Sequence, residues 1–219
     1  MPETVHETQT NMIGFQAATF ISSLAIAASL LLNGCAVSTP ASFYMLHAIQ
    51  NTDSSVGSTR AESGLSVGVG PITIPDYLQR PQMVTRPTAS ALEFSEYHQW
   101  GEALEKNLSR VLVENLSILL PSERVFDYPW QAGLPIEFQV VVDVLHLEKM
   151  PDNSVLLDAR WQVRGGGGEK TLVTNRSKWT IPLPSPGFES IASAESRAVE
   201  ALSREIAREL KSLPRSGTH

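Results

Sequence analysis

The chain has 219 residues, of which 42% are hydrophobic, a net charge of −6 and a single cysteine. This acidic balance is unlike the basic surface of a nucleic-acid-binding protein, so we expect no nucleic-acid partner. One cysteine excludes an internal disulfide framework and a Cys-rich zinc site. About 185 residues follow residue 34, which is a normal size for one globular domain.

An apolar stretch runs from Ile13 to Leu32 near the N-terminus. Roughly 20 apolar residues can span a bilayer, so its length fits both a signal peptide and a transmembrane anchor. The end of the stretch favours the signal peptide, because Leu32-Asn33-Gly34-Cys35 matches the lipobox that signal peptidase II cuts. We predict a signal peptide over residues 1–34, with cleavage set by Leu32, Asn33 and Gly34. We also predict that Cys35 carries diacylglycerol and an N-acyl chain, with no other cofactor.

Two features depart from an ordinary signal of this kind. Asn33 replaces the usual Ala or Ser, and no Lys or Arg occurs before residue 60. A start at Met12 in place of Met1 would remove an acidic leader, and the sequence leaves both starts open. A transmembrane anchor with an incidental cysteine is the alternative. Ala36 is compatible with sorting of a lipoprotein to the outer membrane, while the inner membrane stays open.

The predicted domain boundaries follow from composition. Residues 35–42 form the lipidated cysteine and its tether, 43–213 a single domain, and 214–219 a disordered tail. Within the domain, residue alternation and turn signals predict a series of strands and turns. These are a strand over 43–49, a loop over 50–64, a strand over 65–69 that Gly70-Pro71 ends or bends, a turn over 75–78, and a hairpin of 82–86 with 92–94.

The clearest predicted helix runs from Tyr97 to about Leu120, with apolar residues at spacings of three and four, Ser95 as its N-cap and Pro121 after it. A brief strand over 124–126 follows. Three strands, over 136–149, 154–164 and 171–183, are joined by short links and should therefore be antiparallel neighbours. A last helix is expected from Phe188 to Leu210 or Leu213.

The order of these motifs resembles a known family. The lipobox, Phe43 to Leu46, Val69 to Arg86 and Trp100 to Leu104 are similar to segments of the ABC-type transport auxiliary lipoproteins, and the similarity continues to near residue 210. The resemblance implies an α/β (α+β-like) fold: a mixed, largely antiparallel sheet with two main helices packed on it, like the N-terminal domain of TolB.

The resemblance also implies a function. Members are non-enzymatic accessory or docking subunits of lipid transport systems built with mammalian-cell-entry domain proteins, and they support envelope integrity. We therefore expect a mammalian-cell-entry domain protein as partner, membrane attachment through the lipid anchor, and a location at the periplasmic face of the outer membrane. The lipid, the direction of transport, the partner surface and any homo-oligomer stay open. The alternative is a periplasmic lipid-binding carrier, which would need unfilled core-facing positions.

Catalytic and metal-binding signals are weak. Gly165 to Thr171 superficially resembles a phosphate-binding loop, but Glu169 takes the place of the required glycine and strand-forming residues follow. The histidines lack partners at metal-ligand spacing, which favours structural roles for His98 and His146 and predicts no metal. With Cys35 acylated, no candidate nucleophile remains, and we predict that the chain is not an enzyme.

Five residues are candidates for a protein interface, because aromatic and arginine side chains in loops dominate binding hot spots. The alternative is that Tyr128 and Trp130 cap the core and that the arginines are solvated. The candidates are Tyr77, Arg80, Arg86, Tyr128 and Trp130.

Overall fold

The computed structural model describes residues 39–50, 64–120, 122–165 and 168–214. The chain divides into two units, Met1–Pro40 and Ala41–His219, and the fold described here belongs to the second. The predicted signal peptide, Cys35 and the tail after residue 214 lie outside the described residues. Neither helix that the structure describes is long and apolar enough to cross a bilayer.

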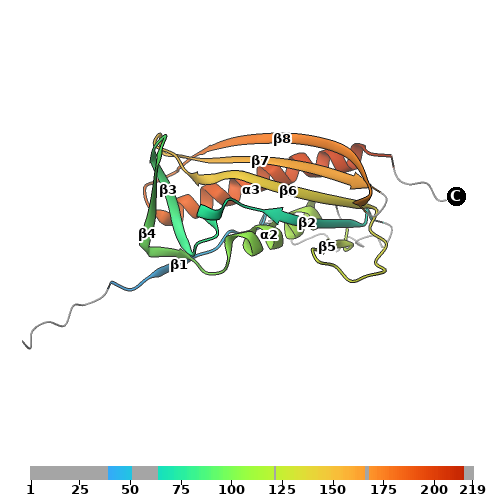
Figure 1. The fold of residues 1–219 in the computed structure, drawn as a ribbon, viewed down its shortest axis with the longest axis horizontal. Coiled ribbons are helices and arrows are strands. Elements are labelled where there is room, and N and C mark those ends of the chain that lie inside the picture. The colour runs from blue at the N-terminus through green and yellow to red at the C-terminus, as the bar shows by residue number, and fades with distance from the viewer. Residues whose placement is uncertain (1–38, 51–63, 121, 166–167, 215–219) are drawn as a thin grey trace, which may run out of the picture. The chain divides into compact units, whose positions relative to one another are not determined.

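The described residues form eight strands, one 3-10 turn and two α-helices (Figure 1). In chain order they are β1 (Ser42–Tyr44), β2 (Val67–Thr73), η1 (Asp76–Leu78), β3 (Gln82–Thr88), β4 (Ala91–Trp100), α2 (Leu104–Leu119), β5 (Val125–Asp127), β6 (Phe138–Lys149), β7 (Ser154–Gly165), β8 (Lys170–Pro182) and α3 (Phe188–Ser212).

One side of the sheet is an antiparallel meander of β6, β7 and β8, as the short links predict, and β8 is its outer strand. On its other edge, β6 pairs in parallel with β2, and β2 pairs in parallel with β5. The antiparallel hairpin of β3 and β4 joins β6 at the C-terminal end of β6, where Thr85 pairs with Lys149. Strand β2 continues beyond Gly70-Pro71 to Thr73 with a shift of register, so this dipeptide bends the strand and does not end it.

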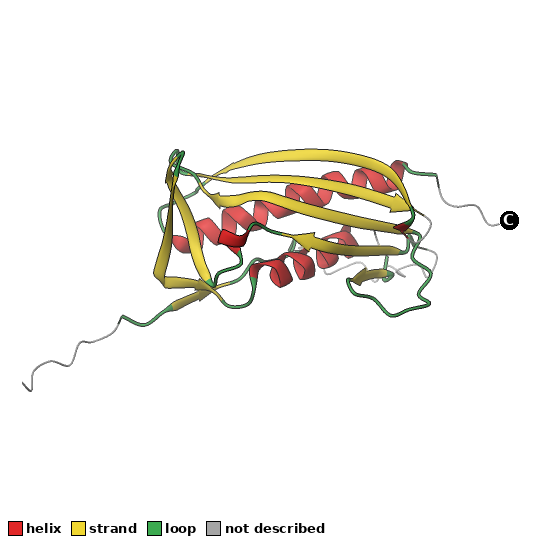
Figure 2. Cartoon of the chain, viewed as in Figure 1, coloured by secondary structure: helices red, strands yellow, loops and turns green. Residues whose placement is uncertain are grey.

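The two helices pack against the sheet and against each other (Figure 2). Helix α3 contacts β6, β7 and β8, while α2 contacts β2 and β5. Side chains alternate along β7, so that every second residue enters the core: Val155, Leu157, Ala159, Trp161 and Val163. The predicted fold class, a mixed sheet with two main helices packed on it, is therefore confirmed.

The N-terminal segment of the domain departs from its predicted strand over 43–49. Only Ser42–Tyr44 is a strand, and it pairs in parallel with β4. The following residues are held by side chains of α2: Asn107 Oδ1 accepts a hydrogen bond from Leu46 N at 2.6 Å, and Asn115 Oδ1 accepts one from Ile49 N at 2.8 Å. Both asparagines are fully buried, so they replace the backbone partners that a longer strand would need.

The predicted start of the first helix was wrong. Tyr97 and Trp100 have helical spacing, but they lie in β4, where Tyr44 pairs with Trp100. Ser95, the predicted N-cap, also lies in β4, and α2 begins only at Leu104. Pairing with β1, a strand more than 50 residues earlier, outweighs the local pattern. The predicted end of this helix and both ends of α3 agree with the structure to within three residues.

Candidate functional site

The five predicted interface residues lie in two separate places. Tyr77, Arg80 and Arg86 come from η1, β3 and the turn between them, beside the end of β6. Tyr128 and Trp130 follow β5 and lie against β2.

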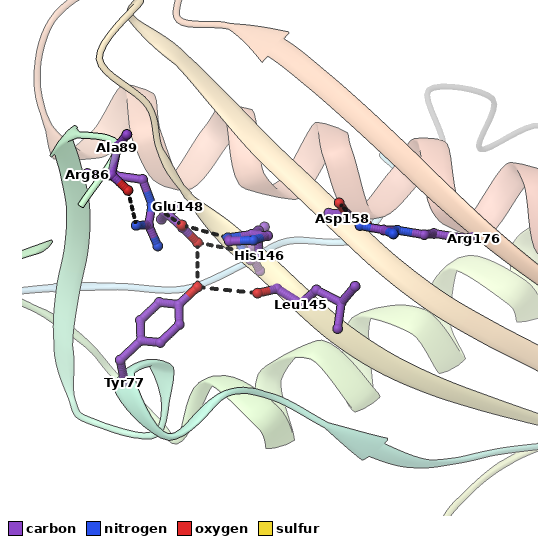
Figure 3. Close-up of polar contacts among 9 residues, drawn as sticks. Tyr77, Arg86, Ala89, Leu145, His146, Glu148, Asp158 and Arg176 are labelled. Atoms are coloured by element: carbon purple, nitrogen blue, oxygen red, sulfur yellow. Dashed lines mark hydrogen bonds and ion pairs between the residues drawn. The ribbon is translucent and has the colours of Figure 1, made fainter. Parts of the chain in front are cut away.

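Tyr77 and Arg86 meet at a buried carboxylate, Glu148, which the sequence analysis did not single out (Figure 3). The Tyr77 hydroxyl donates to Glu148 Oε2 at 2.9 Å, and Arg86 Nε donates to Oε1 at 2.8 Å. The backbone N–H of Leu147 donates to Oε2 at 2.9 Å, and His146 Nδ1 lies 3.0 Å from Oε1. The glutamate side chain is completely shielded from solvent, so it depends on these contacts.

The charges in this cluster are fixed by their surroundings. Burial, and then the nearby charge of Glu148, raise the pKa of Tyr77, so the phenol stays protonated and acts as a donor. The side chain of Arg86 is only 14% exposed and is ion-paired with Glu148. Tyr77, Arg86 and the Leu147 N–H donate three hydrogen bonds to the two oxygens of Glu148, and the side chain is shielded from solvent. The cluster joins η1, β3 and β6 and has the geometry of a structural cross-link.

Arg80 is more exposed than Arg86. Its guanidinium lies over the ring of Phe94 on β4, 5.0 Å from the ring centre. Phe94 is itself exposed, so this pair stands on the solvent side of the β3–β4 hairpin. Of the two arginines, Arg80 is the exposed one, whereas Arg86 is held by Glu148.

Tyr128 and Trp130 contact each other edge to face, with ring centres 5.4 Å apart. Trp130 lies directly on β2: a Cβ atom at Gly68 would be 2.6 Å from its Cζ3. Tyr128 packs in the same way against Gly70, whose φ of +121° favours glycine. Tyr128 nevertheless exposes 50% of its surface. Trp130 has the contacts of a cap on β2, and Tyr128 presents a half-open aromatic face.

A second polar region lies on the sheet face opposite the helices. It is a groove of about 480 Å³, and its lining includes three arginines, Arg160, Arg164 and Arg176. Arg176 Nε and Nη2 donate to the two oxygens of Asp158, both at 2.8 Å. This ion pair lowers the pKa of Asp158, which therefore stays ionised. Arg164 donates twice to Gln162 Oε1. The groove lining also includes a carboxylate, Asp143, which lies opposite Arg160 across the strands. With Arg176 paired to Asp158, Arg160 and Arg164 are the cations left to meet an anionic ligand.

The sequence analysis did not identify this groove. A signal was present, because Arg160, Gln162 and Arg164 alternate with apolar residues along the predicted strand. Their convergence with Arg176 depends on the register between β7 and β8, in which Arg160 pairs with Arg176.

The histidines have structural contacts. His98 stacks on Phe188 with ring centres 4.0 Å apart and forms a 2.8 Å hydrogen bond with the hydroxyl of Tyr44. His146 belongs to the Glu148 cluster. Within the described residues, no group of three or more His, Cys, Asp or Glu side chains could hold a metal ion.

Comparisons with known proteins agree with this architecture. One solved structure, of an uncharacterised protein, is 19% identical and covers 78% of this chain and 99% of its own, with a TM-score of 0.65. Protein XCC0632 from Xanthomonas campestris, of the DUF330 family, is 12% identical and covers 76% of this chain and 93% of its own, with a TM-score of 0.61. These two structures share the fold. No curated protein sequence matches the chain.

The family model described as the ABC-type transport auxiliary lipoprotein component matches residues 44–207. This match runs from the end of β1 to the last turns of α3, and so includes the sheet, both helices, the Glu148 cluster and the basic groove. The chain therefore belongs to the ABC-type transport auxiliary lipoprotein family.

Proposed function

We propose that the chain is a non-enzymatic lipoprotein, anchored at the periplasmic face of the outer membrane, that docks a mammalian-cell-entry domain protein of a lipid transport system. The observation that carries the proposal is the family match over residues 44–207. A transport auxiliary component is not an enzyme class, and membership of a lipoprotein family indicates a location in the cell envelope.

The described side chains support docking more than catalysis. The polar cluster around the buried Glu148 is closed, because Glu148 accepts from Tyr77, Arg86 and the Leu147 N–H. The exposed aromatic and cationic side chains stand outside the core, where a partner could reach them: Phe94, Tyr128, Arg80 and Arg160. Such residue types dominate binding hot spots.

A lipid carrier receives less support. Core-facing residues along β6 and β7, such as Val140 and Leu157, are fully buried and pack with both helices in one cluster. The lining of the groove on the outer face includes three arginines and Asp143, charged groups that an acyl chain would have to desolvate. Mass spectrometry of the purified full chain tests this alternative: co-purified phospholipid in stoichiometric amount would favour a carrier.

The anchor is tested by replacing Cys35 with Ser and labelling cells with a fatty-acid probe. We expect no label and accumulation of the uncleaved precursor, because signal peptidase II cuts only after the thiol is lipidated. Ala36→Ser is the matched control and should remain labelled. Equal labelling of the Cys35→Ser protein would contradict the lipoprotein assignment.

Docking is tested by a pull-down with a mammalian-cell-entry domain protein from the same organism. Arg80→Ala and Tyr128→Ala should each weaken capture, by up to thirtyfold if the side chain contributes about 2 kcal/mol. Both side chains are exposed, so melting temperatures should fall by no more than about 4 °C. Arg208→Ala, on the solvent side of α3, is the control. Normal capture of both variants would place the interface elsewhere, and failure of the wild-type chain to capture the partner would contradict the docking function.

A further inference from the structure

Strand β8 forms a long free edge of the sheet. Its 13 residues, Lys170–Pro182, pair with β7 and with no other described strand, and β8 borders the sheet in Figure 1. Nearly all of its residues are exposed or half-exposed, and Ser177 alone is buried. A free edge presents unpaired backbone N–H and C=O groups that can hydrogen-bond to another extended chain.

The side chains on this edge carry both charge and apolar surface. Thr174, Arg176 and Lys178 follow one another on the outer face, beside the groove that Arg160 and Arg164 line. On the same strand Leu172 is 38% exposed and Trp179 is 36% exposed. Charged residues such as Arg176 and Lys178 on an edge strand commonly prevent aggregation, because they oppose pairing with another sheet.

Protection of the β8 edge against aggregation does not explain why Trp179 is exposed there. Trp179 pairs with Leu157, which is fully buried in the core, so its indole sits on the helix side of the sheet at the open border. A strand added beside β8 would cover the exposed part of Trp179 on one face. On the other face its side chains would lie opposite Arg176 and Lys178.

The positive charges on β8 determine which kind of extended chain can pair with this edge. A second copy pairing β8 with β8 around a two-fold axis would bring two basic stripes together, and like charges opposite each other destabilise a sheet. A membrane surface would engage the arginines but leave the backbone edge unpaired. An extended segment with carboxylates at alternate positions satisfies the backbone, the basic stripe and the groove at once.

We propose that the edge of β8 binds an extended, acidic segment of a partner protein by β-strand addition, with carboxylates facing Lys178 and the Arg160 groove. This inference rests on the proposed docking function and names the chemistry of the partner segment. Arg176 is held by Asp158. Lys178 and Arg160 form no ion pair among the described residues, but Asp158 lies opposite Lys178 and Asp143 lies opposite Arg160 across the strands. Carboxylates of the ligand would therefore compete with these two aspartates for the charges of Lys178 and Arg160.

The test is hydrogen–deuterium exchange of the full chain in detergent, with a synthetic peptide in which glutamate alternates with valine. We expect slower exchange over residues 170–182, because the added strand supplies acceptors to the free N–H groups. A peptide with lysine in place of glutamate is the control and should give no protection. Absence of slowing, or equal slowing with the lysine peptide, would overturn the proposal.

Charge reversal provides the matched variants. Arg160→Glu combined with Lys178→Glu should weaken binding of the glutamate peptide by about tenfold or more, since two attractions become repulsions. Arg208→Glu makes the same kind of change on the exposed side of α3 and should bind normally. Should the double variant melt early, the neutral pair Arg160→Gln and Lys178→Gln replaces it. Unchanged binding by folded variants would contradict the role of these charges.

Two further outcomes separate this inference from its alternatives. Slowed exchange over 170–182 with phosphatidylglycerol vesicles, and none with the peptide, would assign the face to a membrane surface and overturn the proposal. Capture of the transport partner in the pull-down without any effect of the peptide would overturn the inference and leave the proposed docking function intact.

Discussion

Replacing Arg86 with Met should destabilise the domain strongly, because it leaves Glu148 as a buried charge without its cationic partner. Removing one member of a buried ion pair typically costs about 3 to 5 kcal/mol. Tyr77 and the Leu147 N–H still donate to the carboxylate, so we expect the lower end, about 3 kcal/mol. For a domain of this size that loss corresponds to a drop of roughly 6 to 12 °C in melting temperature.

Urea denaturation followed by circular dichroism measures this loss, and Glu148→Gln completes a double-mutant cycle. The double variant should be more stable than the sum of the single losses predicts, because no charge is then left unpaired. Arg80→Met is the matched control: Arg80 is exposed over Phe94, and such a contact contributes about 0.5 to 1 kcal/mol. Equal small losses for Arg86→Met and Arg80→Met would refute the structural role of the cluster.

Three other substitutions test the described packing. Burial, and then the charge of Glu148, raise the pKa of Glu195 well above its ordinary 4.5, so the folded state keeps a proton that the unfolded state releases. Stability should therefore fall as the pH rises above about 4.5, and Glu195→Gln should flatten that fall in urea titrations at successive pH values. Asn107→Ala leaves the buried Leu46 N–H unpaired and should cost about 1 to 3 kcal/mol in the same assay, whereas the exposed control Asn175→Ala should cost less than about 0.5 kcal/mol. Gly68→Ala places a Cβ 2.6 Å from Trp130 and should lower the melting temperature, but much less in a Trp130→Ala background, where space is available; an equal effect in both backgrounds would contradict the contact.

The parts of the fold that local patterns determine were predictable. The strands of the meander alternate, their links are short, and the last helix repeats apolar residues such as Ile191, Ala198 and Leu202 on its buried face. The start of α2 was not predictable from spacing alone, because Tyr97 and Trp100 have helical spacing although they lie in a strand, where Tyr97 is exposed and Trp100 is buried. Pairing with β1 and β3, two separate elements, makes this segment extended.

The polar contacts depend on residues far apart in the sequence. Glu148 is one of two carboxylates in β6, and its partners Tyr77 and Arg86 come 71 and 62 positions earlier. The arginine groove likewise requires the register of β7 and β8. A weaker signal did exist for the N-terminal segment: Asn107 and Asn115 interrupt the apolar face of the helix eight residues apart, which suggests buried hydrogen bonds.

The point at which the chain enters the domain determines how a lipid anchor would transmit force. Ser42 is seven positions after Cys35, so a chain anchored at Cys35 would keep β1 within about 25 Å of the bilayer surface. Tension on the segment between Cys35 and Ser42 would act first on the three-residue pairing of β1 with β4. It would act next on the hydrogen bond between Leu46 and Asn107. Because α2 packs on α3, the load would pass into the helices. Strand β8 is packed on α3, so the load would reach the binding edge only through that helix.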